Sequence, residues 1–298
     1  MRFPSRKVFM KDWMVTSLFL LLSLVLVGYF VYVCIGWNVI VSLSDWKGLT
    51  PSYNIAGFDQ YLSLFHDQVF LTSLKNNLIL ILLFVPGSLF LGLFLAILLD
   101  LKVRGEGAFR SIYLLPFALS FVITATLWAW MYNLDVGVIN TLLEKIGLGF
   151  LRPMWVADPN IAMYCVVLAL IWQFSGYTML IFLGGIRSIP ESQIRAAEVD
   201  GASGFDLYRY VVIPQLKAPA LSAFIVLMVF ALKAFDFIYI LTGGGPGWST
   251  YVLALMMFKE TFRKNQFAYG GAIATILFLL ALVIVVPYLY LSFRREKE

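Results

Sequence analysis

Long apolar stretches constrain the fold of this chain more than any other feature, because six of them are long enough to cross a lipid bilayer. About 20 helical residues at roughly 1.5 Å per residue span the hydrocarbon core. Mean hydropathy is +0.87 and only 13% of the 298 residues are charged, far from the averages of soluble domains. The sequence therefore predicts an all-α integral membrane protein with spans at 14–43, 77–99, 109–132, 161–184, 221–241 and 267–293.

The connections between spans are too short to fold as a soluble domain with its own core. Those on one side are 44–76, 133–160 and 242–266. Within the second, 134–146 is expected to form a short interfacial helix with Asn140, Glu144 and Lys145 facing water. The first span follows a basic N-terminus but is too long for the apolar region of a signal peptide. We therefore expect one membrane domain over 1–298.

The distribution of Lys and Arg predicts the orientation of the spans. Fourteen of the 22 lie at the two termini, between the second and third spans, and in 187–217, whereas seven lie in the three connections named above. The positive-inside rule places the richer side in the cytoplasm. We therefore expect a multi-pass protein of the cytoplasmic (inner) membrane with both termini cytoplasmic. The net charge of +5 then reflects topology, not nucleic-acid binding.

Metal, disulfide and nucleotide sites are not indicated. Cys34 and Cys165 fall within spans, where a thiol behaves as a small apolar group, and nothing around His66 has metal-ligand spacing. The glycine-rich run 243–247 lacks the lysine of a phosphate-binding loop. The chain is therefore expected to bind no cofactor and to hydrolyse no ATP by itself.

The segment 187–217 is unusually polar for so apolar a chain, and it separates the fourth span from the fifth. Pro190 suits the first turn of a short helix, and Gly201 suits the left-handed residue that ends it. A second short helix at 205–212 is expected to stop at Pro214. These signals predict a rigid elbow of two short helices outside the membrane.

The elbow also carries a spaced motif: Arg195-Ala196-Ala197, three residues, Gly201, nine residues, then Val211 to Pro214. This spacing resembles the cytoplasmic coupling loop of ABC-importer permeases. That family has Glu-Ala-Ala, and Arg195 stands at the place of its glutamate. The resemblance implies that the residues coupled to a cytoplasmic ATPase are Arg195, Ala196, Ala197, Asp200, Gly201 and Pro214.

Further motifs, from about residue 57 to the last span, are similar to the carbohydrate branch of these permeases. They are Gly92 to Ala96, Arg110 with Leu115-Pro116, Gly184 to Pro190, Phe235-Asp236, Ile240 to Pro246 and Ser249-Thr250. The resemblance implies a second homologous permease subunit, two cytoplasmic ATPase subunits that bind the ATP and Mg, and an extracytoplasmic solute-binding protein. It also implies an outer gate at Gly243, Gly244, Gly245 and Pro246, although an exposed turn made flexible by glycine explains the same residues.

Two ionisable residues interrupt the fifth span. Lys233 and Asp236 are three residues apart and therefore on neighbouring faces of a helix. Because a lone charge at the bilayer centre costs about 2.5–3.5 kcal/mol, the two are expected to face the bundle and neutralise each other. A structural ion pair and a place in the substrate path both remain open.

In the fourth span, Gln173 and Tyr177 share one helix face, with Trp172 alongside. An aromatic ring and an amide suit a sugar, whereas hydrogen bonding between helices is the alternative. The resemblance places the sugar site near the midplane, with a lining of Gln173, Tyr177, Phe230, Ala231 and Ala234. Ala231 and Ala234 replace the asparagines of maltose-type relatives, which argues against maltose.

Together these features predict a permease subunit of an ATP-driven importer that moves a sugar by alternating access. Glycerol-3-phosphate or a polyol is the second choice of substrate. A secondary transporter would show inverted repeats with broken helices, and an intramembrane enzyme would show a cluster of histidines, cysteines or carboxylates. Neither pattern is evident in the sequence.

Overall fold

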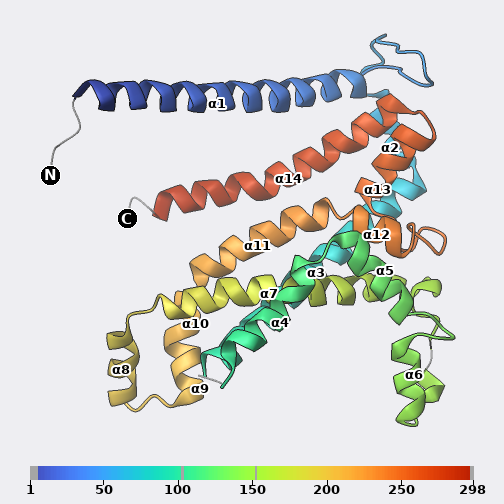
Figure 1. Ribbon diagram of the computed structural model, residues 1–298. Helices are drawn as coiled ribbons and strands as arrows, with labels where there is room; N and C mark the ends of the chain where they lie inside the picture. Colours follow the sequence, from blue (N-terminus) through green and yellow to red (C-terminus); the bar gives the residue numbers. More distant parts are fainter. Residues whose placement is uncertain (1–5, 102–103, 152, 296–298) are drawn as a thin grey trace.

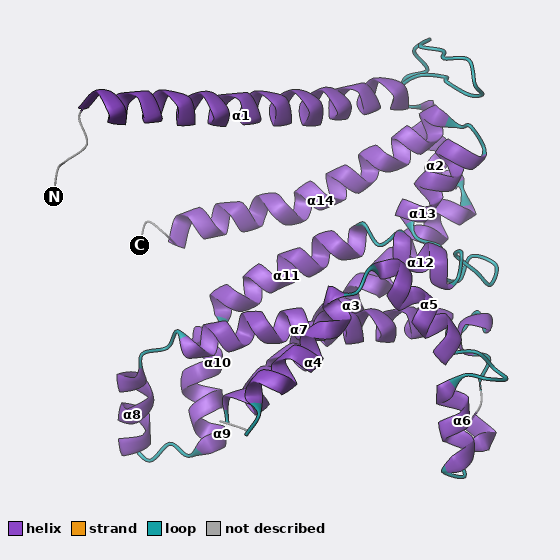
Figure 2. Ribbon diagram, viewed as in Figure 1, coloured by secondary structure: helices purple, strands orange, loops and turns teal. Residues whose placement is uncertain are grey.

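The structure is a computed structural model that describes residues 6–101, 104–151 and 153–295. These ranges are helical with connecting loops and contain no β-strand (Figures 1 and 2). Four helices have the length and hydropathy of a membrane span. Two further pairs of helices, each sharply bent at a short break, have the length and hydropathy of a span when the two helices of the pair are taken together. The four are α1 (Arg6–Ser42), α3 (Gln68–Asp100), α7 (Ala162–Arg187) and α14 (Phe267–Arg295). The all-α membrane fold is therefore confirmed.

The third predicted span, 109–132, is not one helix. α4 (Glu106–Ala118) and α5 (Phe121–Met131) meet at an angle of 97°. Pro116, which lacks a backbone N–H, lies in the last turn of α4. The Ser120 hydroxyl then accepts a hydrogen bond from the N–H of Ile123 at 3.3 Å and caps α5. Apolar composition predicted the extent of this segment but not its change of direction.

The fifth predicted span, 221–241, is also broken. α11 (Lys217–Leu232) is followed by its capping residue Lys233, and α12 (Asp236–Leu241) begins three residues after Lys233. The N–H of Lys233 bonds to two carbonyl oxygens of α11, at 3.0 and 3.2 Å, which closes the last turn. Lys233 and Asp236 therefore do not lie on one continuous helix, and the expectation based on helical spacing is wrong.

The connections at one end of the bundle contain more helix than the sequence predicts. α2 (Asp59–His66) precedes α3, and the segment 242–266 contains α13 (Leu253–Phe258) and a π-helical turn (Lys259–Arg263). This segment packs on α3. The side-chain amide of Asn76 donates to two of its carbonyl oxygens, both at 2.9 Å, and Asn77 accepts from the N–H of Leu253 at 2.8 Å.

The short helix predicted at 134–146 is present as α6 (Val138–Lys145), followed by single 3-10 turns at Gly149–Leu151 and Trp155–Ala157. Asn140 was expected to face water but is 1% exposed. Its Oδ1 accepts from the indole N–H of Trp155 at 2.8 Å. Periodicity identified a polar face, but this part of the face meets the neighbouring loop.

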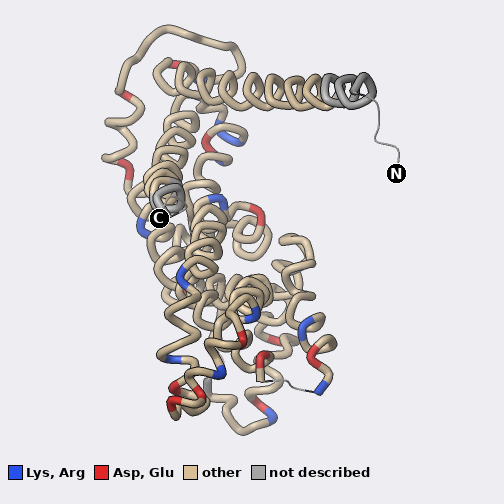
Figure 3. Tube along the Cα trace, turned by 90° about the vertical axis from the view of Figure 1, so that its left-hand side faces the viewer, with Lys and Arg blue, Asp and Glu red and all other residues tan. Residues whose placement is uncertain are grey.

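The long helices α1, α14, α11 and α7 lie side by side in that order (Figure 1). α1 packs on α14 through Asn38, whose side-chain amide donates to Gly271 O at 3.2 Å and to Thr275 Oγ1 at 3.0 Å. The start of α1, the end of α14 and the segment α8–α10 lie at one end of these helices, and α6 lies at the other. Charged residues gather in the connections and are sparse along the spans (Figure 3).

Buried apolar side chains form two separate clusters. The larger, which we call the main core, joins α3, α5, α7, α11, α12, α13 and α14. The smaller lies at the end of the bundle that carries α8–α10, and we call it the elbow core. Its buried members are Leu95, Ala96, Leu99, Met179, Phe182, Leu183, Ile186, Val212 and Leu216.

Candidate functional site

The first helix of the elbow is present close to its predicted position. Pro190 was expected in its first turn but is the residue before it, since α8 (Glu191–Val199) starts at Glu191 and is followed by Asp200. Gly201 has φ +89°, a conformation that side chains with a Cβ rarely adopt. The N–H of Ala202 then bonds to Ala197 O at 2.9 Å, which closes the helix end with a left-handed residue.

The second arm of the elbow is longer than predicted. α9 (Gly204–Asp206), a π-helical segment (Leu207–Val212) and α10 (Ile213–Gln215) follow one another without a break. Pro214 was expected to stop this arm, but it lies within α10. The arm continues for one residue beyond Pro214 and ends at Gln215. The change of direction comes at Leu216, where the arm meets α11 at 65°.

α8 offers an open surface, since none of its residues is buried. Arg195 bonds to Glu191 of the same helix at 2.8 Å, and their side chains are 70% and 77% exposed. An exposed pair of this kind adds about 0.3–0.5 kcal/mol, so it does not explain why the helix exists. Ala196, Asp200 and Gly201 are also exposed, and Ala197 is half-buried. The first part of the spaced motif, Arg195 to Gly201, therefore lies on a surface that a partner can reach, whereas Val212 in its second part is buried.

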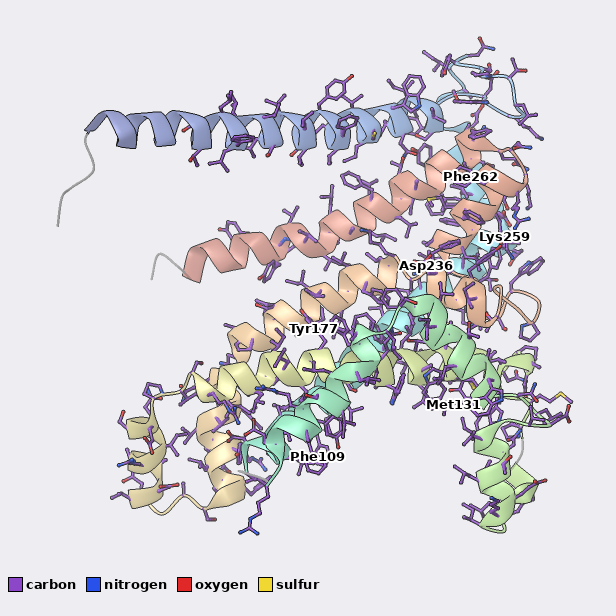
Figure 4. All side chains as sticks on the ribbon, viewed as in Figure 1. Phe109, Met131, Tyr177, Asp236, Lys259 and Phe262 are labelled. Atoms are coloured by element: carbon purple, nitrogen blue, oxygen red, sulfur yellow. The ribbon has the colours of Figure 1, made fainter. Side chains whose placement is uncertain are left out.

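An aromatic cluster lies where α4 turns into α5, near the middle of the bundle (Figure 4). Tyr177 of α7 stacks on Phe117 with ring centroids 5.1 Å apart. The ring centroid of Phe230, in α11, lies 4.3 Å from that of Phe174 and 4.8 Å from that of Phe121. Tyr177 and Phe230 were predicted from the sequence, but Phe117, Phe121 and Phe174 were not, because nothing in a single apolar stretch shows which rings meet.

The other residues assigned to a substrate lining are buried. Gln173 is fully buried; its amide nitrogen donates to Leu119 O at 3.3 Å, and its Oε1 has no partner. Ala231 and Ala234 are 0% and 1% exposed. In this structure Gln173 therefore braces the bend between α4 and α5, while Tyr177 and Phe230 keep part of their rings accessible.

Lys233 and Asp236 are both exposed and form no ion pair with each other or with any other described residue. The predicted mutual neutralisation is therefore not seen, because the helix ends between them. Lys233 lines a groove of about 630 Å³ between α11, α13 and α14, whose other lining side chains are apolar. Asp236 lies at the start of α12 (Figure 4).

The glycine-rich run is a braced loop. Gly243, Gly244 and Gly247 have φ of +61°, +92° and +59°. The buried Thr250 hydroxyl donates to Gly245 O at 2.9 Å, and its oxygen lies 2.7 Å from that of Thr242. The glycines supply the backbone conformations, while side-chain hydrogen bonds fix the loop. Thr242 and Thr250 were named from the sequence only as parts of the family motifs, and their bracing hydrogen bonds were not predicted.

Lys259 also holds this loop. Its ammonium donates to Gly243 O at 2.8 Å and lies 4.7 Å from the centre of the Tyr251 ring. Burial lowers the pKa of Lys259, and burial raises the pKa of Tyr251 to about 12. The lysine is therefore a cation held partly out of water by a carbonyl and an aromatic face.

Residues 88–297 match the family described as "binding-protein-dependent transport system inner membrane component", and the chain belongs to this family. Its members are membrane subunits, so the protein is a transport subunit of the inner membrane and not an enzyme. It is 65% identical over 281 residues to a probable ABC transporter permease of Pyrococcus horikoshii, covering 94% of this chain and 96% of the relative.

A second relative supports the same assignment, and a solved structure shows the same fold. The xylose/arabinose import permease XacH of Haloferax volcanii is 45% identical over 273 residues, or 91% of this chain and 86% of the relative. A chain of the bacterial alginate ABC transporter, crystallised with a periplasmic protein carrying an alginate pentasaccharide, has the same fold. Its TM-score is 0.81 at 23% identity, over 97% of this chain and 96% of that chain.

Proposed function

We propose that the chain is the permease subunit of an ATP-driven importer that carries a sugar across the cytoplasmic membrane by alternating access. The observation that carries this proposal is the elbow: a polar, exposed helix at the ends of membrane spans, in a chain of the binding-protein-dependent family. A polar surface held at the ends of membrane spans suits a partner outside the membrane. The partner would be a cytoplasmic ATPase, which binds the ATP and Mg.

Different elbow residues would contact the ATPase and set the geometry of the elbow. Arg195, Ala196 and Asp200 would meet the ATPase, because their side chains are exposed. Gly201 would set the angle between α8 and the second arm through its positive φ. In Figure 1 the start of α1 and the end of α14 lie at the same end of the long helices as the elbow, which supports cytoplasmic termini under the positive-inside rule. The opposite end, with the loop 243–247, would then face the solute-binding protein.

The substrate path would pass the aromatic cluster. The accessible parts of Tyr177 and Phe230 offer apolar ring faces to the C–H faces of a sugar. Lys233, Ala234 and Asp236 lie at the break between α11 and α12, and a break inside a membrane is tolerated where it lines a cavity or is buried in protein. A second permease subunit would close the other side of the path.

The substrate class rests on the relatives. Because a protein 45% identical to this chain is a xylose/arabinose import permease, a pentose is the first sugar to test. The chain should be co-expressed with a second permease, an ATPase and a solute-binding protein from the same organism and reconstituted in liposomes. ATP-dependent uptake of labelled xylose or arabinose is the expected result. Uptake of glycerol-3-phosphate and of no sugar would contradict the proposal, as would ATP hydrolysis by the purified chain free of partners.

A further inference from the structure

We propose that the elbow drives α4 directly, through two side-chain links that join it to the ends of α3 and α4. The links are Tyr208 to Asp100 and Arg187 to Glu106. Through them the elbow, the end of α3, the end of α7 and the whole of α4 move as one unit, which we call the transmission unit. This inference rests on the proposed function and names the residues through which coupling is passed on.

The first link joins the elbow to α3. The Tyr208 hydroxyl donates to Asp100 Oδ2 at 2.6 Å, across 108 residues of sequence. Asp100 is the last residue of α3, where a carboxylate faces the negative end of the helix dipole. An acidic residue is unfavourable at that position unless a donor compensates it, and Tyr208 is such a donor. The link is therefore more than an incidental surface contact.

Tyr208 lies on the side of the π-helical segment that faces the elbow core. Within this segment Val212 is buried in the elbow core and Tyr208 packs against that core, while Tyr210 is exposed. The segment thus presents Tyr208 to α3 and keeps the opposite side of the arm open.

The second link joins the start of the elbow to α4. Arg187, the last residue of α7, lies with Nη2 2.8 Å from Oε1 of Glu106, the first residue of α4. Both charges suit their own helix ends, since a cation favours a C-terminus and an anion an N-terminus. The side chains are 45% and 27% exposed. This link fixes the two ends relative to each other and adds little to overall stability.

The elbow core binds the same parts together by apolar contact. Its buried side chains come from the second halves of α3 and α7 and from the elbow, and Tyr113 and Leu114 of α4 pack against it. No described residue of α1 or α14 belongs to it. The two polar links therefore join parts that are already closely packed against each other. Helices α1 and α14, on the other side of α11, lie outside the transmission unit.

α4 is held to α7 along its whole length. Beyond the Glu106 link, the backbone at Tyr113 approaches Gly176 so closely that a Cβ on that glycine would lie 2.7 Å from the Tyr113 carbonyl carbon. Phe117 stacks on Tyr177, and the carbonyl of Leu119 accepts from Gln173. A movement of the elbow end of α4 is thus carried to the aromatic cluster of the proposed substrate path.

The sharpest test is a charge exchange at the second link, with sugar transported per ATP hydrolysed as the readout in the reconstituted complex. Glu106→Arg and Arg187→Glu should each lower this ratio by at least about fivefold, the lower part of the range for coupling between sites. The double exchange should restore at least half of the wild-type ratio. Wild-type ratios in both single variants, or a double variant no better than the singles, would overturn the proposal.

The first link is tested by a pair of substitutions and a matched control. Tyr208→Phe and Asp100→Ala should lower the ratio equally, and the double variant should be no worse than either, because both remove the same bond. Asp100→Asn keeps an acceptor oxygen, so its ratio of sugar transported to ATP hydrolysed should stay closer to wild type than that of Asp100→Ala. Tyr210→Phe removes a neighbouring hydroxyl that is exposed, and it should match wild type. Additive losses, or an equal loss in Tyr210→Phe, would overturn the link.

The wild-type complex separates this inference from the proposed function. If wild type takes up no sugar with ATP, the proposed function fails. If wild type transports and the link variants assemble, bind the solute-binding protein normally and transport with an unchanged ratio, only the transmission unit fails.

Discussion

The ammonium of Lys259 lies 2.8 Å from the carbonyl oxygen of Gly243, and it thereby ties the π-helical turn that follows α13 to the glycine-rich loop that follows α12. The contact joins residues from the two ends of the 242–266 connection. It gives the loop a fixed position relative to the main core, which holds Leu253 and Leu255 of α13 fully buried.

Lys259→Met should release this loop while leaving the helices folded. A hydrogen bond to a charged group contributes about 1.5–3 kcal/mol, so amide exchange at Gly244 and Gly245 should speed up about tenfold or more. Hydrogen–deuterium exchange with mass spectrometry measures this. Lys259→Arg keeps a cation and its donors and should retain part of the protection. Lys47→Met removes an exposed lysine from another connection and should leave exchange at the two glycines unchanged; a slower rate in Lys259→Met would contradict the assignment.

Two glycines of α7 should respond oppositely to alanine. At Gly176 a Cβ would lie 2.7 Å from the Tyr113 carbonyl carbon and 3.0 Å from Leu114 Cα, whereas at Gly184 nothing lies within 4 Å. Gly176→Ala should therefore destabilise the chain by about 1–3 kcal/mol through overpacking. Gly184→Ala should be neutral or stabilising by about 0.5–1 kcal/mol, because alanine favours a helix. Thermal unfolding in detergent measures both, and an equal Tm for the two variants would refute the close packing of α4 on α7.

The elbow contains a second matched pair of glycines. Gly201 has φ +89° and Gly204 has no positive φ, and neither has an atom near the position of a Cβ. Gly201→Ala should cost about 1–2 kcal/mol from the left-handed conformation alone, and Gly201→Val should cost more. Both should reduce sugar-stimulated ATPase activity in the assembled complex, and Gly204→Ala should not. Normal stimulation in Gly201→Val would exclude the angle of the elbow as a requirement for coupling.

Lys233 and Asp236 should act independently of each other. They form no ion pair in the described chain, so the losses in transport from Lys233→Ala and Asp236→Ala should add within about 0.5 kcal/mol in the double variant. Sugar uptake by the reconstituted complex, measured for wild type, both single variants and the double variant, gives the double-mutant cycle. A double variant that is better than both singles would show that the two charges neutralise each other in the working protein.

The amino-acid sequence determined those features that depend on composition and on local backbone chemistry. Long apolar runs had to become membrane helices, since only helices satisfy their own backbone hydrogen bonds in lipid. Pro190 and Gly201 set the ends of α8 because a fixed φ and a positive φ each suit one position of a helix boundary. The spaced motif that follows was enough to indicate the family.

The tertiary structure decided what depends on contacts between distant segments. The bend at Leu119 is held by Gln173 from α7, and Asn140 is buried because Trp155 reaches it. Lys233 and Asp236 are separated because α11 ends between them, at a place with no proline or glycine to mark it. Tyr208 meets Asp100 across 108 residues. Apolar periodicity gives the length and the faces of a helix, but it does not give its partners, and these contacts are set by which helices pack together.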